Sequence, residues 1–268
     1  MIIFLKNNKY KKQFSKQHQI TKTIEKIMDT ENHNVTENRT TYAVWIGDRS
    51  GSMAGLEKAH SDGYNRFIDE QIKEKTGQFF LTTIRFDNNV EFVNKNVPIN
   101  SVKKATKETF KARGSTALND AIGYGINHIL KIYEMNNQSS QSNYIIVIMT
   151  DGFENSSKEY TDKMIKKMIK DCKMKDISVK FTGANQDAEY TGGKFGLDKT
   201  QCITFDATPR GMGILFRSVS DSIKRHRSVG YSEFSKLDKQ KNNGYEDDDQ
   251  NNLNKTMPPP YYLLNNKE

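Results

Sequence analysis

The stretch that decides the fold is Tyr42-Ala43-Val44-Trp45-Ile46-Gly47-Asp48-Arg49-Ser50-Gly51-Ser52-Met53. Its apolar first half predicts a buried strand, and the polar half that follows predicts a loop at the end of that strand. Asp48, Ser50 and Ser52 occupy alternate positions, so in an extended loop their side chains point the same way. Carboxylate and hydroxyl oxygens gathered in this manner suit a hard divalent cation. The alternative is a turn whose Asp and Ser side chains cap the next helix.

Strand-like segments alternate with amphipathic helical segments from Thr40 to about Gly230. This alternation predicts an α/β fold with a doubly wound, mostly parallel six-stranded sheet in the order 3-2-1-4-5-6 and helices on both faces. Val90–Val93 is expected to be the antiparallel edge strand. Tyr144–Met149 is apolar throughout, which predicts a central strand buried on both faces. Ligands of such sheets bind beyond the carboxyl ends of the strands, where the strand order reverses.

Two further loops are expected at that crevice. Thr116 stands at a predicted helix start, and Asp151 ends the predicted central strand. Together with Asp48 and the two serines they would supply two carboxylates and three hydroxyls. This donor set suits an octahedral Mg²⁺ or Mn²⁺ that keeps some of its waters.

These loops resemble the metal-ion-dependent adhesion site (MIDAS) of a von Willebrand factor A (vWA) domain. The DxSxS element is Asp48-Arg49-Ser50-Gly51-Ser52, the threonine of the second loop is Thr116, and the aspartate of the third is Asp151. The resemblance covers about residues 40–230. Within the family, the chain is most similar in type to stand-alone bacterial and viral vWA proteins. It implies a Rossmann-like vWA fold.

The resemblance also implies a function. It implies a non-catalytic protein-binding module, in which a Glu or Asp of a partner protein completes the shell of the bound metal. Ser50 and Ser52 would bind the ion directly, and Thr116 would do so when the partner is bound. Asp48 and Asp151 would act mostly through water.

Composition predicts a core domain between two polar ends. The chain has 268 residues, 35% of them hydrophobic, and a net charge of +8. Residues 1–39 form a basic, Lys/Asn-rich arm, expected to be largely disordered or to hold one short helix. Residues 231–268, with the acidic run Glu246–Asp249, are expected to be a disordered tail. Cys172 and Cys202 are expected to be buried thiols. A cytoplasmic location is expected because no signal peptide or membrane span is visible.

The end of the chain suggests an alternative function. Pro258, Pro259 and Tyr261 fall in Pro258-Pro259-Pro260-Tyr261, which matches the PPxY ligand of WW domains. The chain would then be an intracellular adaptor that recruits WW-domain proteins through its tail. The other interpretation is a proline run that happens to precede a tyrosine.

Two more alternatives are weaker. A Mg²⁺-dependent phosphohydrolase would want a nucleophilic Asp with a second acid two residues on, where this chain has Ser50. His60, His128 and His226 fall in predicted helices and are interpreted as structural or surface residues. Nucleic-acid binding is not expected, because no zinc finger, helix-turn-helix or aromatic RNA-binding signature accompanies the basic charge.

Overall fold

The computed structural model describes residues 39–137, 141–184 and 187–242. Residues 1–38 of the predicted arm lie outside the described residues. So does the tail after residue 242, which contains the acidic run and the Pro258, Pro259 and Tyr261 motif.

One six-stranded sheet runs through the molecule in the order β3-β2-β1-β4-β5-β6. All neighbouring strands are parallel except β2 and β3, so the predicted order and the antiparallel edge are confirmed. Its strands are β1 Thr40–Asp48, β2 Phe79–Phe86, β3 Val90–Pro98, β4 Ser142–Thr150, β5 Ile177–Ala184 and β6 Cys202–Phe205. The edge strand β3 is longer than predicted, because its polar, half-exposed residues and its irregular register on β2 hide the period-two pattern.

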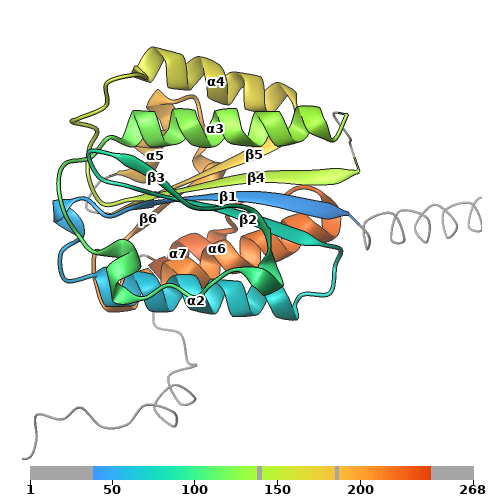
Figure 1. Cartoon of the computed structure of the whole chain (residues 1–268), viewed down its shortest axis with the longest axis horizontal. Helices are drawn as coiled ribbons and strands as arrows, with labels where there is room; N and C mark the ends of the chain where they lie inside the picture. The colour runs from blue at the N-terminus through green and yellow to red at the C-terminus, as the bar shows by residue number, and fades with distance from the viewer. Residues whose placement is uncertain (1–38, 138–140, 185–186, 243–268) are drawn as a thin grey trace, which may run out of the picture.

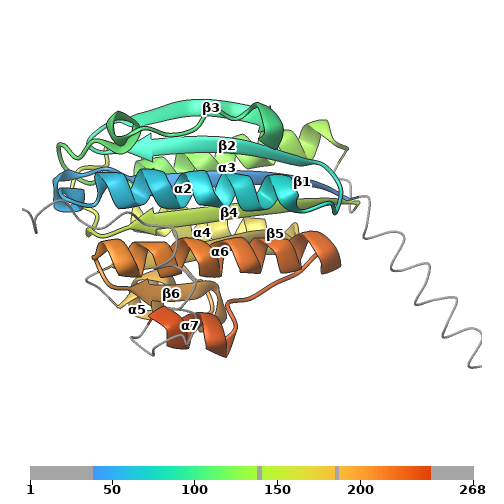
Figure 2. The same cartoon turned by 90° about the horizontal axis from the view of Figure 1, so that it is seen from below.

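Helices cover both faces of this sheet (Figure 1). One face carries α3 Leu118–Met135, α4 Asp162–Met174 and the short α5 Ala188–Lys194. The opposite face carries α2 Glu57–Lys73 and α6 Pro209–Val229, with α7 Lys236–Asn242 beside α6. Short 3-10 turns lie at η1 Gly51–Met53, η2 Ile99–Ser101, η3 Lys107–Phe110 and η4 Lys199–Gln201. Figure 2 shows α2 and α6 lying side by side, with their axes roughly along the direction of the strands.

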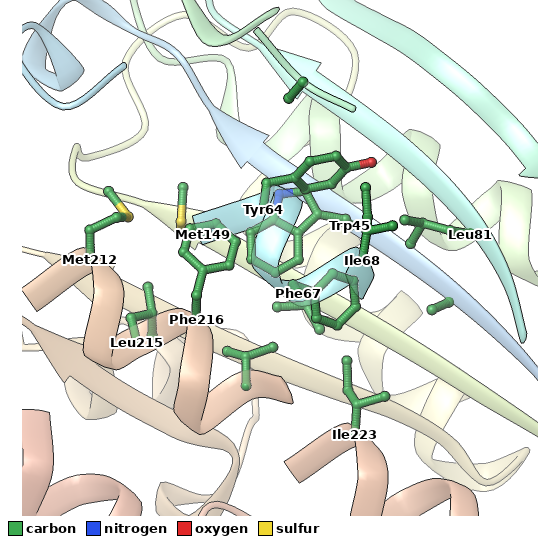
Figure 3. Close-up of a cluster of buried hydrophobic side chains, with 14 of the residues drawn as sticks. Trp45, Tyr64, Phe67, Ile68, Leu81, Met149, Met212, Leu215, Phe216 and Ile223 are labelled. Atoms are coloured by element: carbon green, nitrogen blue, oxygen red, sulfur yellow. The ribbon is translucent and has the colours of Figure 1, made fainter. Parts of the chain in front are cut away.

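The α2/α6 face has an aromatic core (Figure 3). Trp45 of β1 stacks on Phe216 of α6 at 4.9 Å between ring centroids, and Phe67 and Tyr64 of α2 pack on the same indole. Gly63 allows this arrangement, because a Cβ atom there would stand 2.1 Å from Cδ2 of Phe216. The Trp45 and Phe216 rings therefore fit together because α2 has no side chain at Gly63, where α6 approaches it.

The α3/α4 face has a mostly aliphatic core instead. Val44 and Ile46 of β1 and Ile146 and Ile148 of β4 point to this side, where they meet the buried side of α3. Gly125 brings α3 close to the sheet, since a Cβ atom there would lie 2.6 Å from Cδ1 of Ile46. β1 and β4 contribute side chains to both cores, since both strands are buried on both faces. This burial was predicted for β4.

The fold continues beyond the predicted end of the domain at residue 230. Gly230 closes α6 with a φ of +77°. Phe234 then packs into the aromatic core, and the Nζ atom of buried Lys180 donates to the Ser232 carbonyl at 2.9 Å. The helix α7 follows, so the predicted boundary at 230 is too early. Single anchoring contacts hold this segment, and they leave no periodic signal in the sequence.

Two expectations from composition can be compared with the described residues. Cys172 and Cys202 are buried free thiols, as expected, and burial raises the pKa of each to about 12. No helix in the described ranges combines the length and hydropathy that crossing a bilayer requires.

Candidate metal centre

The candidate site lies where the central strands β1 and β4 end. These strands are parallel neighbours, and Gly47 stands opposite Met149 in their register, so Asp48 and Asp151 leave the same edge of the sheet. After β1 the chain enters α2 on one face, and after β4 it enters α4 on the other (Figure 1). The two aspartates therefore flank the point where the strand order reverses, at the crevice where the sequence placed them.

Asp48 holds the first loop to the second of these strands. Its Oδ1 atom accepts a hydrogen bond from the Ser50 main-chain N–H at 2.6 Å. Its Oδ2 atom accepts one from the Thr150 hydroxyl, also at 2.6 Å. Burial raises the pKa of Asp48 to about 6, although these two hydrogen bonds act in the opposite direction. The Asp48 carboxylate thus fixes the loop that carries Ser50 and Ser52 to the end of β4.

The two serines and Asp151 form a row of oxygen atoms. Oγ of Ser50 lies 3.0 Å from Oγ of Ser52, which in turn donates to Oδ1 of Asp151 at 2.6 Å. The other carboxylate oxygen of Asp151, Oδ2, is buried and has no hydrogen-bond partner. Burial raises the pKa of Asp151 as well. A buried carboxylate oxygen without a donor is costly, so this position suits an added positive charge.

Thr116 reaches the same place from the second loop. Its main-chain N–H donates to Oδ1 of Asn155 at 2.8 Å, and the Asn155 N–H donates back to the Thr116 carbonyl. A Cβ atom on Gly152 would stand 3.1 Å from Oγ1 of Thr116 and 3.3 Å from Oγ of Ser52. The two hydroxyls thus both lie close to the position that a Gly152 side chain would take, and the absence of that side chain leaves room beside them.

The structure differs from the sequence expectation in how the second loop begins its helix. The predicted helix started at residues 114–116, whereas α3 begins at Leu118. The intervening loop is fixed by tertiary bonds: Gly51 N–H donates to the Gly114 carbonyl, and Ala117 N–H donates to the Asp87 carbonyl. Thr116 is therefore a loop residue held by the first and third loops.

Arg49 is a residue whose importance the sequence reasoning missed. It is the spacer between Asp48 and Ser50, yet it is buried, with its guanidinium 3.0 Å from Asp87 and 2.5 Å from Glu91. Arg113 pairs with the same two acids. These ion pairs fasten the first loop to the turn between β2 and β3. The only sequence signal was a set of opposite charges in three separate loops.

The donor set fits a hard divalent cation. It contains only carboxylate and hydroxyl oxygens, and it includes a buried carboxylate oxygen without a partner. In the described ranges, no three His, Cys, Asp or Glu side chains form a metal-binding group. An ion held at this edge would consequently depend on the serine and threonine hydroxyls.

Comparisons with known proteins bear on the fold. No family model and no curated protein sequence matches this chain. Among solved structures, the vWF domain of the type V pili tip protein Mfa5 from Porphyromonas gingivalis superimposes with a TM-score of 0.52 at 10% identity, over 70% of this chain and 96% of that domain. The pilus adhesin SpaC from Lactobacillus rhamnosus GG gives 0.54 at 12% identity, over 70% of this chain and 30% of SpaC.

A third structure, the PilB minor pilin from Streptococcus sanguinis, gives a TM-score of 0.50 at 12% identity, over 70% of this chain and 62% of PilB. The matched region thus spans less than two thirds of PilB and of SpaC. At these identities the likeness concerns the fold alone. The chain has the von Willebrand factor A fold, a Rossmann-like sheet with helices on both faces, as the sequence predicted.

Proposed function

We propose that this chain is a metal-ion-dependent protein-binding module of the vWA/MIDAS type. In this proposal Mg²⁺ or Mn²⁺ is held by Asp48, Ser50, Ser52, Thr116 and Asp151, and a Glu or Asp of a partner protein completes the ion's shell. The observation that carries the proposal is the buried, unpartnered Oδ2 of Asp151 at the end of the Ser50–Ser52–Asp151 row.

The hydrogen bonds give the residues separate roles. Both oxygens of Asp48 already accept hydrogen bonds, so Asp48 is suited to positioning Ser50 and to supplying negative charge from beneath. The hydroxyls of Ser50, Ser52 and Thr116 are suited to direct contact. A bound ion with mostly neutral ligands would keep a positive charge that attracts an outside carboxylate. The chain's own contribution is to hold these oxygens in place before the partner arrives.

The neighbours in fold are consistent with a binding role. SpaC is named as a pilus adhesin, and Mfa5 is named as a pilus tip protein. The fold is the part that this chain shares with them. The identity of any partner of this chain stays open to experiment.

We favour binding over catalysis because of the residue types and hydrogen bonds of the first loop. Ser50 occupies the position where a phosphohydrolase would carry its second acid. Both oxygens of Asp48 are engaged by Ser50 and Thr150, which leaves them poorly placed to attack a substrate. A phosphatase assay with Mg²⁺ tests this directly, and turnover that Ser52→Ala abolishes would contradict it. Intracellular location and recruitment of WW-domain proteins through Tyr261 stay predictions.

Calorimetric titration with Mg²⁺ tests the metal proposal. We expect binding heats with the wild type and with Ser115→Ala, an exposed serine next to Thr116 that has no assigned role. Ser52→Ala should weaken binding at least about tenfold, because it removes a direct ligand. Thermal melts of each variant in EDTA verify folding. Equal affinities in all three proteins, or no binding by the wild type, would refute the proposal.

A further inference from the structure

The helix α4 presents a face of lysines to solvent. Its buried residues, Ile165, Ile169 and Cys172, point to the α3/α4 core. On the opposite side, successive helical positions at 100° intervals place five lysines within an arc of roughly 120°. These exposed side chains, here named the lysine face, are Lys163, Lys166, Lys167, Lys170 and Lys173.

The positive charge of the lysine face is largely uncompensated. Within the described part of the chain, Lys173 pairs with Asp198 at 2.9 Å, and no ion pair is formed by the other four lysines. Other surface lysines have acidic partners, such as Lys58 with Asp62 and Lys104 with Asp69. The carboxylate of Asp162, at the start of α4, accepts from the Asn119 side chain instead. A face of this kind attracts an anionic partner.

The lysine face is joined to the candidate metal centre by the loop between β4 and α4. The loop after Asp151 leads directly to the first turn of α4 (Figure 1). Asp120 fixes this loop by accepting hydrogen bonds from the main-chain N–H groups of Lys158, Glu159 and Tyr160 at 2.8 to 2.9 Å. The lysines then run along α4, away from the loop that follows Asp151, over about 15 Å. The two surfaces are thus held in a fixed relation.

We propose that the lysine face binds an acidic polypeptide segment of a partner protein. The inference that this is the same partner whose carboxylate reaches the metal rests on the proposed function above. Charge complementarity and continuity with a carboxylate-seeking site are the observations that support it. Several Asp or Glu residues placed on either side of the metal-bound acid could lie along α4. Their contribution would be electrostatic, and hence sensitive to salt.

Two other anions fit the lysine face less well. The described side chains of α4 include no aromatic ring on which a base could stack. A membrane would need a broad apolar surface to insert. Met164 and Met174 of α4 are exposed, but Ile165, Ile169 and Cys172 are packed against the sheet and α3. An acidic protein segment needs neither a stacking ring nor an apolar surface.

The test measures binding of a fluorescent ten-residue polyglutamate peptide to the full chain in EDTA by anisotropy. The test variant is Lys163→Gln/Lys167→Gln/Lys170→Gln. The matched control is Lys73→Gln/Lys103→Gln/Lys107→Gln, which removes the same number of charges from exposed lysines on the α2 side of the sheet. We expect at least tenfold weaker binding for the first triple and less than twofold weaker binding for the second. Equal losses, or no binding by the wild type, would overturn the proposal.

Two further arms separate the possible outcomes. Single-stranded nucleic acid and phosphatidylserine vesicles replace the peptide, and tighter binding of either through the same lysines would overturn the protein assignment. Ser52→Ala should keep wild-type peptide affinity in EDTA. If Ser52→Ala leaves Mg²⁺ affinity unchanged while the lysine triple still loses the peptide, the metal proposal fails and the lysine face stands without it.

Discussion

Two buried polar clusters lie at opposite ends of the sheet, and they differ in the kind of atom that each leaves without a hydrogen-bond partner. At the end where β2 begins, the guanidinium of Arg227 donates to the main-chain carbonyls of four residues and to one side-chain oxygen. The acceptors are the carbonyls of Gln71, Glu74, Thr76 and Gly77 and Oε1 of Gln71. Nε of Arg227 and Nδ1 of the adjacent His226 are buried here without a partner in the described part of the chain. We call this the closed end.

The edge of the sheet with the candidate metal centre is here called the open end. Its buried atoms without a hydrogen-bond partner include a carboxylate oxygen. Oδ2 of Asp151 is buried without a donor, and neither ring nitrogen of buried His60 has a partner. The difference teaches what kind of cluster each is. A buried guanidinium surrounded by main-chain acceptors stabilises the fold, whereas a buried carboxylate oxygen without a donor is a position that suits a cation from outside.

The largest expected effect tests the closed end. Arg227→Met leaves several buried carbonyls without a donor, so we expect the free energy of unfolding to fall by about 3 kcal/mol. Urea unfolding measures this, with Arg210→Met, an exposed arginine in the first turn of the same helix, as the control. Mg²⁺ affinity should not change. A loss below about 1 kcal/mol would mean that the carbonyls find other partners.

The second effect tests the open end. Asp151→Asn removes the charge that the ion would neutralise, so we expect Mg²⁺ affinity to fall roughly 10- to 100-fold in calorimetric titration. Without Mg²⁺ the free energy of unfolding should stay unchanged or rise, because an uncompensated buried carboxylate is lost. Asp62→Asn, on the exposed surface of α2, is the control. If Asp151→Asn instead destabilises the protein in EDTA, the two ends are alike and the comparison fails.

A third prediction asks whether close packing also holds the closed end together. Gln71 is on α2 and Arg227 on α6, and Gly63 lets these helices approach. Gly63→Ala would push against Phe216, so we expect a loss of about 1 to 3 kcal/mol in unfolding free energy. Gly213→Ala is the matched control: a Cβ atom there meets nothing within 4 Å, and it should stabilise α6 by up to about 1 kcal/mol. Equal effects of the two changes on the free energy of unfolding would show that α2 and α6 can move apart at little cost.

The smallest expected effect concerns His60 at the open end. Burial lowers its pKa to about 3, so the folded protein keeps the ring neutral while the unfolded chain binds a proton below about pH 6.5. The resulting stability is present above pH 6.5 and is lost as the pH falls toward 3, by about 1 kcal/mol between pH 6.5 and 5.5. His60→Phe, which keeps a ring against Phe110, should remove that loss. The measurement is urea unfolding at both pH values.

The pH experiment needs one further comparison. His226, near the closed end, also has a pKa lowered to about 3 by burial. The His60→Phe variant should therefore keep the share of the pH dependence that His226 causes. An unchanged slope in His60→Phe would show that His60 is accessible to protons in the folded state.

The sequence predicted the fold well because the decisive patterns are local. β1 and β4 are apolar runs ending in polar loops, and this pattern is visible within ten residues. The end of the domain was predicted less well. The Nζ atom of Lys180 lies over the Phe234 ring and Arg225 donates to Asp238 of α7, and no period in the sequence marks such contacts.

The candidate site was predicted in part. The five oxygen-bearing residues could be chosen from motif spacing, and the three loops do meet at one edge of the sheet. The roles of Arg49 and Asn155 could not be chosen in this way, because each acts through a residue of another loop. A spacer arginine and a loop asparagine look the same in sequence whether they are buried or exposed.

The sequence by itself determined which strands form and which residue types stand at their ends. Those properties follow from hydrophobic periodicity and from side chains two apart sharing a side. Only the tertiary structure decided which of these oxygens the protein satisfies. Thr150 reaches Asp48 across 102 positions, whereas Oδ2 of Asp151 is left without a donor. Satisfaction of a buried polar atom depends on neighbours from distant segments, so it is fixed when the strands pair and cannot be read from any one stretch.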